Sequence, residues 1–286
     1  MIMEAAKKHI SMKSVLFKVL VYGLLLAGLL LILYPLYITV ITAFKSPAES
    51  TQNFFAFPKS LYLENFKSVF KKANYLRYFM NSIFVTVVSV AVIMLLTPMC
   101  AYAISRNMKK KYFKFVYLYI LAGLFVPFQA LMVPLVNYTA ALNLNNQFGL
   151  ILLHVTFAAP QAVFLLVNYI RSVPQDLESA ALIDGCTTFG AYWRIVLPLI
   201  SPMLVTVLVL NAMWIWNDFQ LSLMILNKSP DSWTLPLFQY NFKSQYTFDY
   251  NMAFASYLVA IVPIILIYIF AQRYIVDGLT QGAVKS

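Results

Sequence analysis

Long stretches without a single Asp, Glu, Lys or Arg limit what this 286-residue chain can fold into. Four of these stretches are each long enough for the roughly 20 residues that carry a helix across a bilayer: 19–44, 78–105, 195–217 and 250–272. A fifth stretch, 115–170, has room for two such helices, joined by a polar turn at 143–147. Hydrophobic residues make up 62% of the chain and charged residues 11%, which is far outside the soluble range. The sequence therefore predicts an all-α membrane protein with six transmembrane helices.

The six helices are expected to form a single membrane domain over residues 1–286. The predicted spans lie at about 19–44, 80–105, 115–141, 148–170, 198–226 and 250–274. The external loop 45–79 separates the first two, and Leu63, Phe66 and Phe70 share a helical face in it, which indicates a short helix on the outer leaflet. Asn81 and Ser82 are predicted to cap the second span.

The basic residues set the expected orientation. Five of them fall within 106–114, between the second and third spans, and short loops rich in Lys and Arg face the cytoplasm. This places both chain termini and the loop 171–198 in the cytoplasm. The apolar run that follows Lys18 is too long for a signal-peptide core, so we expect it to remain as the first anchor.

The loop 171–198 has the features of two short helices joined by a turn. Pro174 suits a first helical turn, acidic residues follow it, and Gly185 is placed to end that helix. A second helix would begin after Thr187 or Thr188 and end at Pro198. It would carry four apolar residues on one inward face, suited to the underside of a bundle or to the membrane interface: Phe189, Tyr192, Trp193 and Val196. By themselves, these features are equally compatible with an ordinary amphipathic connector.

Several polar residues lie inside the predicted spans. Asn211, Trp214 and Asp218 fall at i, i+3 and i+7, and polar groups beside an aromatic ring suit the hydroxyls and ring faces of sugars. Helix-to-helix hydrogen bonding explains the same residues equally well. Asn137 is a weaker candidate for a translocation path. His154 has no acidic partner within 115–170, which favours a neutral helix-interface histidine over a proton relay.

Proline residues in the third span predict a weakened helix. Pro127 and Pro134 lie seven residues apart and interrupt the hydrogen-bond ladder. A packing kink is favoured over a gating hinge, since proline is common in membrane helices.

The chain lacks the motifs of an enzyme or a nucleotide-binding protein. It has eight glycines and no G-x-x-x-x-G-K-[ST] pattern, so we expect no catalytic residue and no bound cofactor or metal. No basic motif with interleaved aromatic residues indicates nucleic acid as a partner. The rival classes are an ion-coupled carrier, an intramembrane protease and a membrane scaffold. The carrier would require acids within the membrane, and the protease a glycine-flanked serine with a histidine partner.

The loop 171–198 resembles the cytoplasmic "EAA" loop of ABC-importer permeases. The matching positions are Ala180, Ala181, Gly185, Ile195, Leu197 and Pro198. Ser179 replaces the motif glutamate, and Glu178 precedes it. Further stretches, including 216–219 and 278–285, are similar to the shorter six-span permeases of maltose-type and multiple-sugar importers.

The resemblance implies a type I ABC-importer permease of the bacterial cytoplasmic membrane that imports carbohydrate (oligosaccharide), with a non-sugar solute as the alternative. Its expected partners are a second permease in a heterodimer, a dimeric ATPase that holds ATP and Mg, an extracytoplasmic sugar-binding protein and the bilayer. The residues expected to dock on the ATPase are Glu178, Ser179, Ala180, Ala181, Asp184 and Gly185. The tail 276–286 is expected to contact the ATPase through Thr280, Gln281, Gly282 and Ala283.

Overall fold

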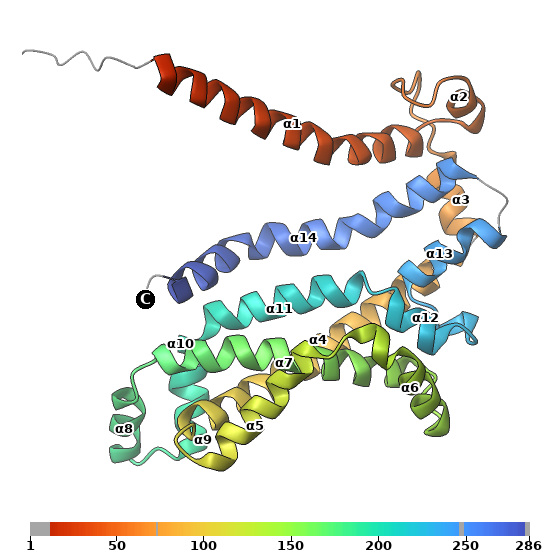
Figure 1. Cartoon of the computed structure of the whole chain (residues 1–286). Helices are drawn as coiled ribbons and strands as arrows, with labels where there is room; N and C mark the ends of the chain where they lie inside the picture. The colour runs from red at the N-terminus through yellow and green to blue at the C-terminus, as the bar shows by residue number, and fades with distance from the viewer. Residues whose placement is uncertain (1–11, 73, 246–248, 284–286) are drawn as a thin grey trace, which may run out of the picture. The chain divides into compact units, whose positions relative to one another are not determined.

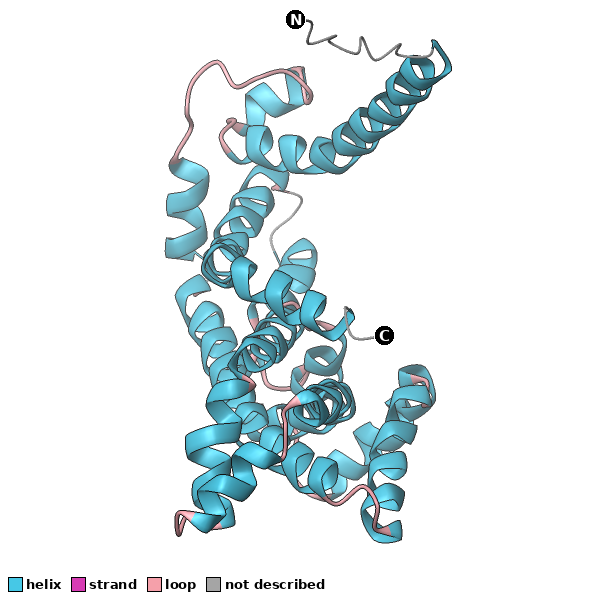
Figure 2. Cartoon of the chain, turned by 90° about the vertical axis from the view of Figure 1, so that its left-hand side faces the viewer, coloured by secondary structure: helices cyan, strands magenta, loops and turns pink. Residues whose placement is uncertain are grey.

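The computed structural model describes residues 12–72, 74–245 and 249–283, and over these residues it contains helices and loops but no strand (Figures 1 and 2). Contacts between Cα atoms divide the chain into two compact units. The first comprises Met1–Val69 with Phe248–Leu258, and the second Phe70–Thr247 with Val259–Ser286. The two units are described separately below.

The first unit contains α1 (Met12–Ala43), α2 (Pro47–Gln52), most of α3 (Glu64–Lys72) and the start of α14 (Tyr250–Ala283). Two buried asparagines connect these helices. Asn65 Nδ2 donates to the carbonyl oxygens of Ala43 and Lys45 at 2.8 and 2.7 Å. Asn251 Nδ2 donates to the carbonyl oxygens of Thr42 and Lys45 at 2.9 and 3.0 Å. These bonds satisfy carbonyls that the end of α1 leaves without partners in its own helix.

The predicted helix in the loop 45–79 exists as α3, and the apolar side that we expected to lie on the outer leaflet is not its buried side. Asn65 and Val69 are buried, whereas Leu63 and Phe70 are half exposed. The hydrogen bonds of Asn65 to the end of α1 determine which side of α3 faces inward, and apolar spacing alone did not reveal them.

Two long helices form the centre of the second unit. α4 (Tyr75–Arg106) and α7 (Gln147–Ser172) pack along one another, and α11 (Ser201–Trp216) packs against both (Figure 1). The buried positions include small residues that permit close approach of helices. On α4 these are Ser82, Ser89 and Ala101, and on α7 Gly149, Ala158 and Ala162.

Asn81 and Ser82 do not cap the second span, because α4 begins six residues earlier, at Tyr75. They bind another segment of the second unit instead. Asn81 Nδ2 donates to the carbonyl oxygens of Asp231 and Trp233, and the Leu235 amide donates to Ser82 Oγ at 2.8 Å. The polar pair therefore fixes the start of α13 (Leu235–Gln245) against α4.

Two of the predicted spans are bent sharply. α5 (Lys111–Ala122) with η1 (Gly123–Phe125) meets α6 (Phe128–Ala141) at 102°. The break falls at Pro127, so the predicted packing kink is in fact an interruption of the helix, and Pro134 lies inside α6. Four described helices are long and apolar enough to cross a membrane, or up to six if each bent pair counts as one span.

The second bend precedes α11. α9 (Thr188–Ala191), the π-helix η2 (Tyr192–Val196) and α10 (Leu197–Leu199) run on without a gap, and a 75° bend separates them from α11. Pro198 lies within α10, so it does not end the preceding helix as predicted. The predicted span 198–226 therefore contains α10, α11 and, after a break at 217–219, α12 (Gln220–Leu226).

Candidate functional site

A short helix, α8 (Asp176–Ile183), connects the end of α7 to α9. Gly185 follows it with φ +83°, a left-handed conformation that costs a residue with a Cβ about 1–2 kcal/mol. The Gly185 amide donates to the Leu182 carbonyl at 3.1 Å, and the Cys186 amide to the Ala181 carbonyl at 2.9 Å. These two bonds form a Schellman ending, so the prediction that Gly185 ends the first helix is confirmed.

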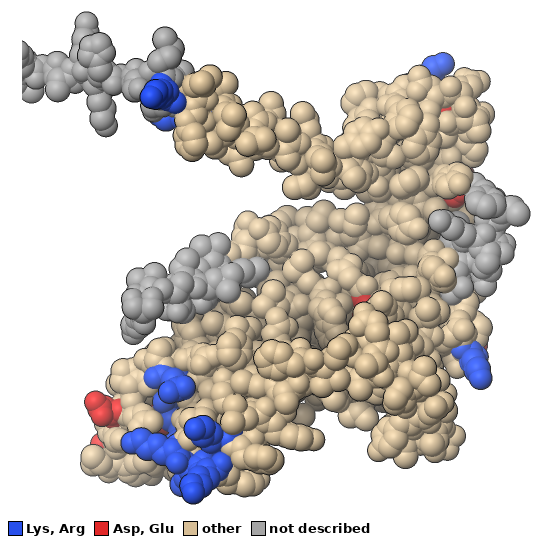
Figure 3. Space-filling model, viewed as in Figure 1, with Lys and Arg blue, Asp and Glu red and all other residues tan. Residues whose placement is uncertain are grey.

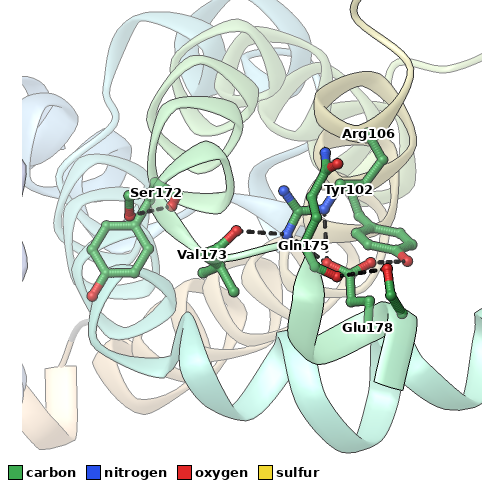
Figure 4. Close-up of polar contacts among 8 residues, drawn as sticks. Tyr102, Arg106, Ser172, Val173, Gln175 and Glu178 are labelled. Carbon is green, nitrogen blue, oxygen red and sulfur yellow. Dashed lines mark hydrogen bonds and ion pairs between the residues drawn. The ribbon is translucent and has the colours of Figure 1, made fainter. Parts of the chain in front are cut away.

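The carboxylate of Glu178 is directed into the protein and fastens α8 to the end of α4 (Figure 4). Arg106 donates to Glu178 Oε1 from Nε at 2.8 Å and from Nη2 at 2.5 Å. The Tyr102 hydroxyl donates to Glu178 Oε2 at 2.7 Å, and Arg106 Nη2 also donates to the Val173 carbonyl at 3.2 Å. The side chains of Arg106 and Glu178 are only 12% and 11% exposed, so solvent screens this ion pair weakly.

The other residues predicted to dock on an ATPase lie mostly on the outside of the protein. Ser179, Ala180, Asp184 and Gly185 are exposed, and Ala181 is half-buried. Close to them, Ile183 is 86% exposed, an unusual environment for an isoleucine. The outer face of α8 thus combines small residues with a protruding apolar side chain. Glu178 differs from the predicted set, because its carboxylate is occupied within the chain.

The second half of the loop 171–198 begins as predicted. Thr187 caps α9, since its Oγ1 accepts a hydrogen bond from the Gly190 amide at 3.1 Å. Of the four predicted inward-facing residues, Tyr192 and Val196 are buried, whereas Phe189 and Trp193 are 61% and 42% exposed. Phe189 lies in α9, before the π-helix, whereas from Tyr192 onward the wider π-helical turn departs from the α-helical spacing that the prediction assumed.

Basic side chains gather on the surface around this loop (Figure 3). The exposed members are Lys109, Lys110, Lys111, Lys114, Arg171 and Arg194. They flank the ends of α4, α5 and α7, which agrees with the clustering of Lys and Arg that the sequence analysis used to orient the chain.

Two of the predicted path residues lie together in a cavity beside α11. The cavity has a volume of about 490 Å³, and Trp214, Asn217, Asp218 and Gln220 are among the residues that line it. Asn211 does not join them, because it is buried and its Nδ2 donates to the Val207 carbonyl of its own helix at 2.7 Å.

Asn137 lies exposed on α6 and does not line the cavity. The structure therefore brings together two of the four predicted path residues.

His154 has an acidic neighbour that the sequence analysis missed. Its Nε2 lies 3.3 Å from Asp218 Oδ2, and its ring meets the Trp214 ring edge-on, with centroids 5.4 Å apart. Asp218 also accepts hydrogen bonds from the Leu221 and Ser222 amides, at 3.2 and 3.0 Å, and so caps α12. The expectation of no acidic partner was wrong because it considered only residues within 115–170.

The remaining predictions concern metal binding and the C-terminal tail. Among the described residues, no group of three or more His, Cys, Asp or Glu is arranged to hold a metal ion. α14 extends to Ala283, but the side chains of Thr280, Gln281, Gly282 and Ala283 lie outside the described part of the chain, as do residues 284–286 of the predicted tail.

Known proteins provide an independent comparison. The family described as "Binding-protein-dependent transport system inner membrane component" matches residues 93–281. The multiple sugar-binding transport system permease protein MsmG of Streptococcus mutans is 46% identical over 266 residues, covering 92% of this chain and 96% of MsmG. The probable starch degradation products transport system permease protein AmyC of Thermoanaerobacterium thermosulfurigenes is 38% identical, covering 90% of this chain and 93% of AmyC.

A solved structure shares the fold. It is the crystal structure of a bacterial ABC transporter involved in the import of the acidic polysaccharide alginate, and one of its chains matches with a TM-score of 0.80 at 22% identity. The match covers 92% of this chain and 98% of that one. With the helical architecture and the sequence match over residues 93–281, the chain belongs to the inner membrane components of binding-protein-dependent transport systems, as a multi-pass ABC transporter permease.

Proposed function

We propose that this chain is a permease subunit of an ATP-driven importer of carbohydrate, of oligosaccharide size, in the bacterial cytoplasmic membrane. The 46% identity to a multiple sugar-binding transport system permease over 92% of the chain carries this proposal. The name of the AmyC relative, which refers to starch degradation products, also supports a carbohydrate. A permease for a non-sugar solute is the alternative.

The proposed transporter contains this chain, a second permease, two ATPase subunits and an extracytoplasmic sugar-binding protein. The sequence contains no phosphate-binding motif, so ATP and Mg are assigned to the ATPase. The family description supports a binding protein as a partner. The basic cluster around the loop 171–198 supports a cytoplasmic position for this loop and for both chain termini.

The outer face of α8 is proposed to be the contact with the ATPase. Ser179, Ala180, Asp184 and Gly185 are exposed there, and small residues let a partner's backbone approach closely. Ile183 would be covered in the same contact, which would remove an exposed apolar side chain from water.

Glu178 is proposed to pass the movement of α8 into the membrane. Its carboxylate binds Arg106 at the end of α4, and α4 packs along α7 and α11. A displacement of α8 would therefore pull on the end of a 32-residue helix at the centre of the second unit. In this arrangement the docking residues and the transmitting residue face opposite ways on one short helix.

The cavity beside α11 is proposed to belong to the translocation path. Trp214 is 41% exposed and offers an aromatic face for a sugar ring, while Asn217 and Gln220 offer hydrogen-bonding groups. The Trp214→Ala change is expected to lower uptake or alter sugar preference without changing the resting ATPase activity.

Reconstitution of the complete transporter in liposomes tests the proposal. Uptake of labelled oligosaccharide is expected to require both ATP and the binding protein. The Ala180→Trp variant should reduce uptake per ATP hydrolysed or prevent the ATPase from binding, because a bulky ring blocks close approach. Ala56→Trp, at an exposed site far from α8 in the sequence, is the matched control.

Normal uptake by the Ala180→Trp variant would disprove the docking face. Uptake that continues without ATP and stops when the proton gradient is collapsed would overturn the proposed function itself.

A further inference from the structure

A basic cleft lies at the end of α4, against the link between α7 and α8. It has a volume of about 540 Å³, and Ser105, Arg106, Lys109, Arg171 and Gln175 are among the residues that line it. Figure 4 shows Arg106, Val173 and Gln175 facing one another at this place. The cleft is separate from the outer face of α8, since none of the exposed docking residues lines it.

The cleft carries positive charge that the protein does not neutralise. Glu178 neutralises Arg106, but neither Lys109 nor Arg171 forms an ion pair with an acidic side chain in the described part of the chain. Arg106 also has donors to spare, because Glu178 and Val173 engage only its Nε and Nη2. The cleft is therefore suited to an anion with several acceptor oxygens.

A buried hydroxyl in the cleft supports a ligand independently of the charges. Ser105 is 7% exposed, and its Oγ has no hydrogen-bond partner among the described residues. Buried hydroxyls in folded proteins nearly always have a partner. Ser105 lines the same cleft, so with a rotation of its side chain Oγ would bond to an oxygen atom of a ligand held by Lys109 and Arg171.

The position of the cleft along the helices favours a lipid head group as the source of the anion. Arg106 and Arg171 lie in the last turns of α4 and α7, two helices that are apolar enough to cross a membrane. Long basic side chains at the ends of membrane-spanning helices reach toward the head groups, so we place the cleft at that depth. α5 begins two residues after Lys109 and exposes Tyr112, Phe115 and Tyr119, an apolar surface suited to an acyl chain.

We propose that this cleft binds the phosphate head group of an anionic phospholipid from the cytoplasmic leaflet. Lys109 and Arg171 provide the charge, Ser105 a hydrogen bond to a phosphate oxygen, and α5 the surface for the lipid tail. The bound phosphate would lie beside Arg106, the residue that fastens α8 to α4. Membrane lipid composition would then influence how firmly α8 is held.

Lipid binding to the purified, delipidated transporter complex tests this proposal. Phosphatidylglycerol would be titrated and its retention measured by native mass spectrometry, with phosphatidylcholine and inorganic phosphate as separate arms. The double variant Lys109→Gln/Arg171→Gln should bind phosphatidylglycerol about 30-fold more weakly, from about fivefold for each basic charge. The control Lys110→Gln/Lys114→Gln removes the same charge from residues that do not line the cleft, so it should weaken binding clearly less than the cleft variant.

The single variant Ser105→Ala distinguishes specific binding in the cleft from non-specific electrostatic attraction of anionic lipid. It leaves the charge unchanged and should still weaken binding by about threefold to tenfold, through one lost hydrogen bond. Equal weakening in the two double variants, or no effect of Ser105→Ala, would overturn the proposal. Displacement of the lipid by millimolar inorganic phosphate would show that a free anion is the ligand instead. These measurements require no transport, so their failure is distinct from failure of the proposed function.

Discussion

The second unit buries two carboxylates at the starts of short helices, and they serve different purposes. Glu178 lies in the first turn of α8, and Asp218 precedes α12. Glu178 binds Arg106 and Tyr102, which both belong to α4. Asp218 instead accepts bonds chiefly from α12 itself, from the Leu221 and Ser222 amides and the Ser222 hydroxyl.

This difference separates a tertiary cross-link from a local cap. Glu178 holds two helices together, so a force on α8 reaches α4. Asp218 mainly stabilises the break that follows α11, and its contact with His154 of α7 carries charge only if the imidazole is protonated. We therefore assign the proposed transmission of movement to Glu178, whose charged partner Arg106 belongs to another helix, and not to Asp218. The predictions below test each half of this comparison.

Among the changes to the two carboxylates and their partners, the largest effect is expected from Arg106→Met. The change leaves Glu178 buried without its counter-ion, and breaking such a pair costs about 3–5 kcal/mol. We expect the lower end of this range, about 3 kcal/mol, because the two side chains remain 12% and 11% exposed to solvent. Chemical unfolding in detergent, followed by tryptophan fluorescence, measures it.

The double variant Arg106→Met/Glu178→Met provides the control for this prediction. Apolar residues in place of both charges should recover most of the lost stability. Uptake per ATP hydrolysed should remain low, since the specific link between α8 and α4 is absent. If the single variant is as stable as the wild type, the ion pair is not the cross-link that we infer.

The contrast between the two carboxylates also shows what the sequence could reveal. Charge-free stretches predicted the apolar helices, and Gly185 predicted the end of α8, because these features depend on neighbouring residues. The partner of Glu178 is 72 residues earlier in the chain, and that of Asp218 is 64 residues earlier. Such pairings arise from helix packing, so no local pattern indicated them.

The bends were missed for a related reason. Proline at 127 predicted weakness in the third span, but the spacing of prolines does not specify an angle of 102°. The π-helix from Tyr192 to Val196 was likewise missed, because apolar periodicity does not distinguish it from an α-helix. Local signals thus located the interruptions without specifying their geometry.

The second-largest effect is expected from Asp218→Ala, which removes a helix cap together with the neighbour of a buried histidine. Loss of a cap costs about 0.5–2 kcal/mol, and burial places this site at the upper end, about 2 kcal/mol. The sugar-stimulated ATPase activity should fall less than in the Arg106→Met variant, because α8 stays attached to α4. A coupling defect as severe as that of Arg106→Met would contradict the distinction between cap and cross-link.

Gly185→Ala tests the C-terminal end of α8, opposite to the first turn that contains Glu178. A Cβ at this position meets no atom within 4 Å, so only the left-handed backbone opposes the change. The expected cost is about 1 kcal/mol. Gly149→Ala is the informative contrast, because its Cβ would approach the Leu144 carbonyl oxygen to 1.9 Å, and we expect it to lower expression of folded protein sharply. If the two variants behaved alike, the structure would be wrong about one of the two turns.

The smallest effect is expected from Asp218→Asn. This substitution tests whether His154 and Asp218 form an ion pair. Asparagine caps a helix about as well as aspartate, but it offers one acceptor oxygen where Oδ1 and Oδ2 of Asp218 accept from the Leu221 and Ser222 amides, so one of these bonds is lost. With a neutral imidazole the loss should stay below about 1 kcal/mol, since no buried charge is left unpaired. With a protonated imidazole the same substitution would leave a positive charge without a counter-ion at a fully buried site, and the loss of stability would be several times larger. Unfolding measured beside Asp218→Ala at pH 7 distinguishes the two cases, and a loss as large as that of Arg106→Met would make His154 and Asp218 a second cross-link between helices.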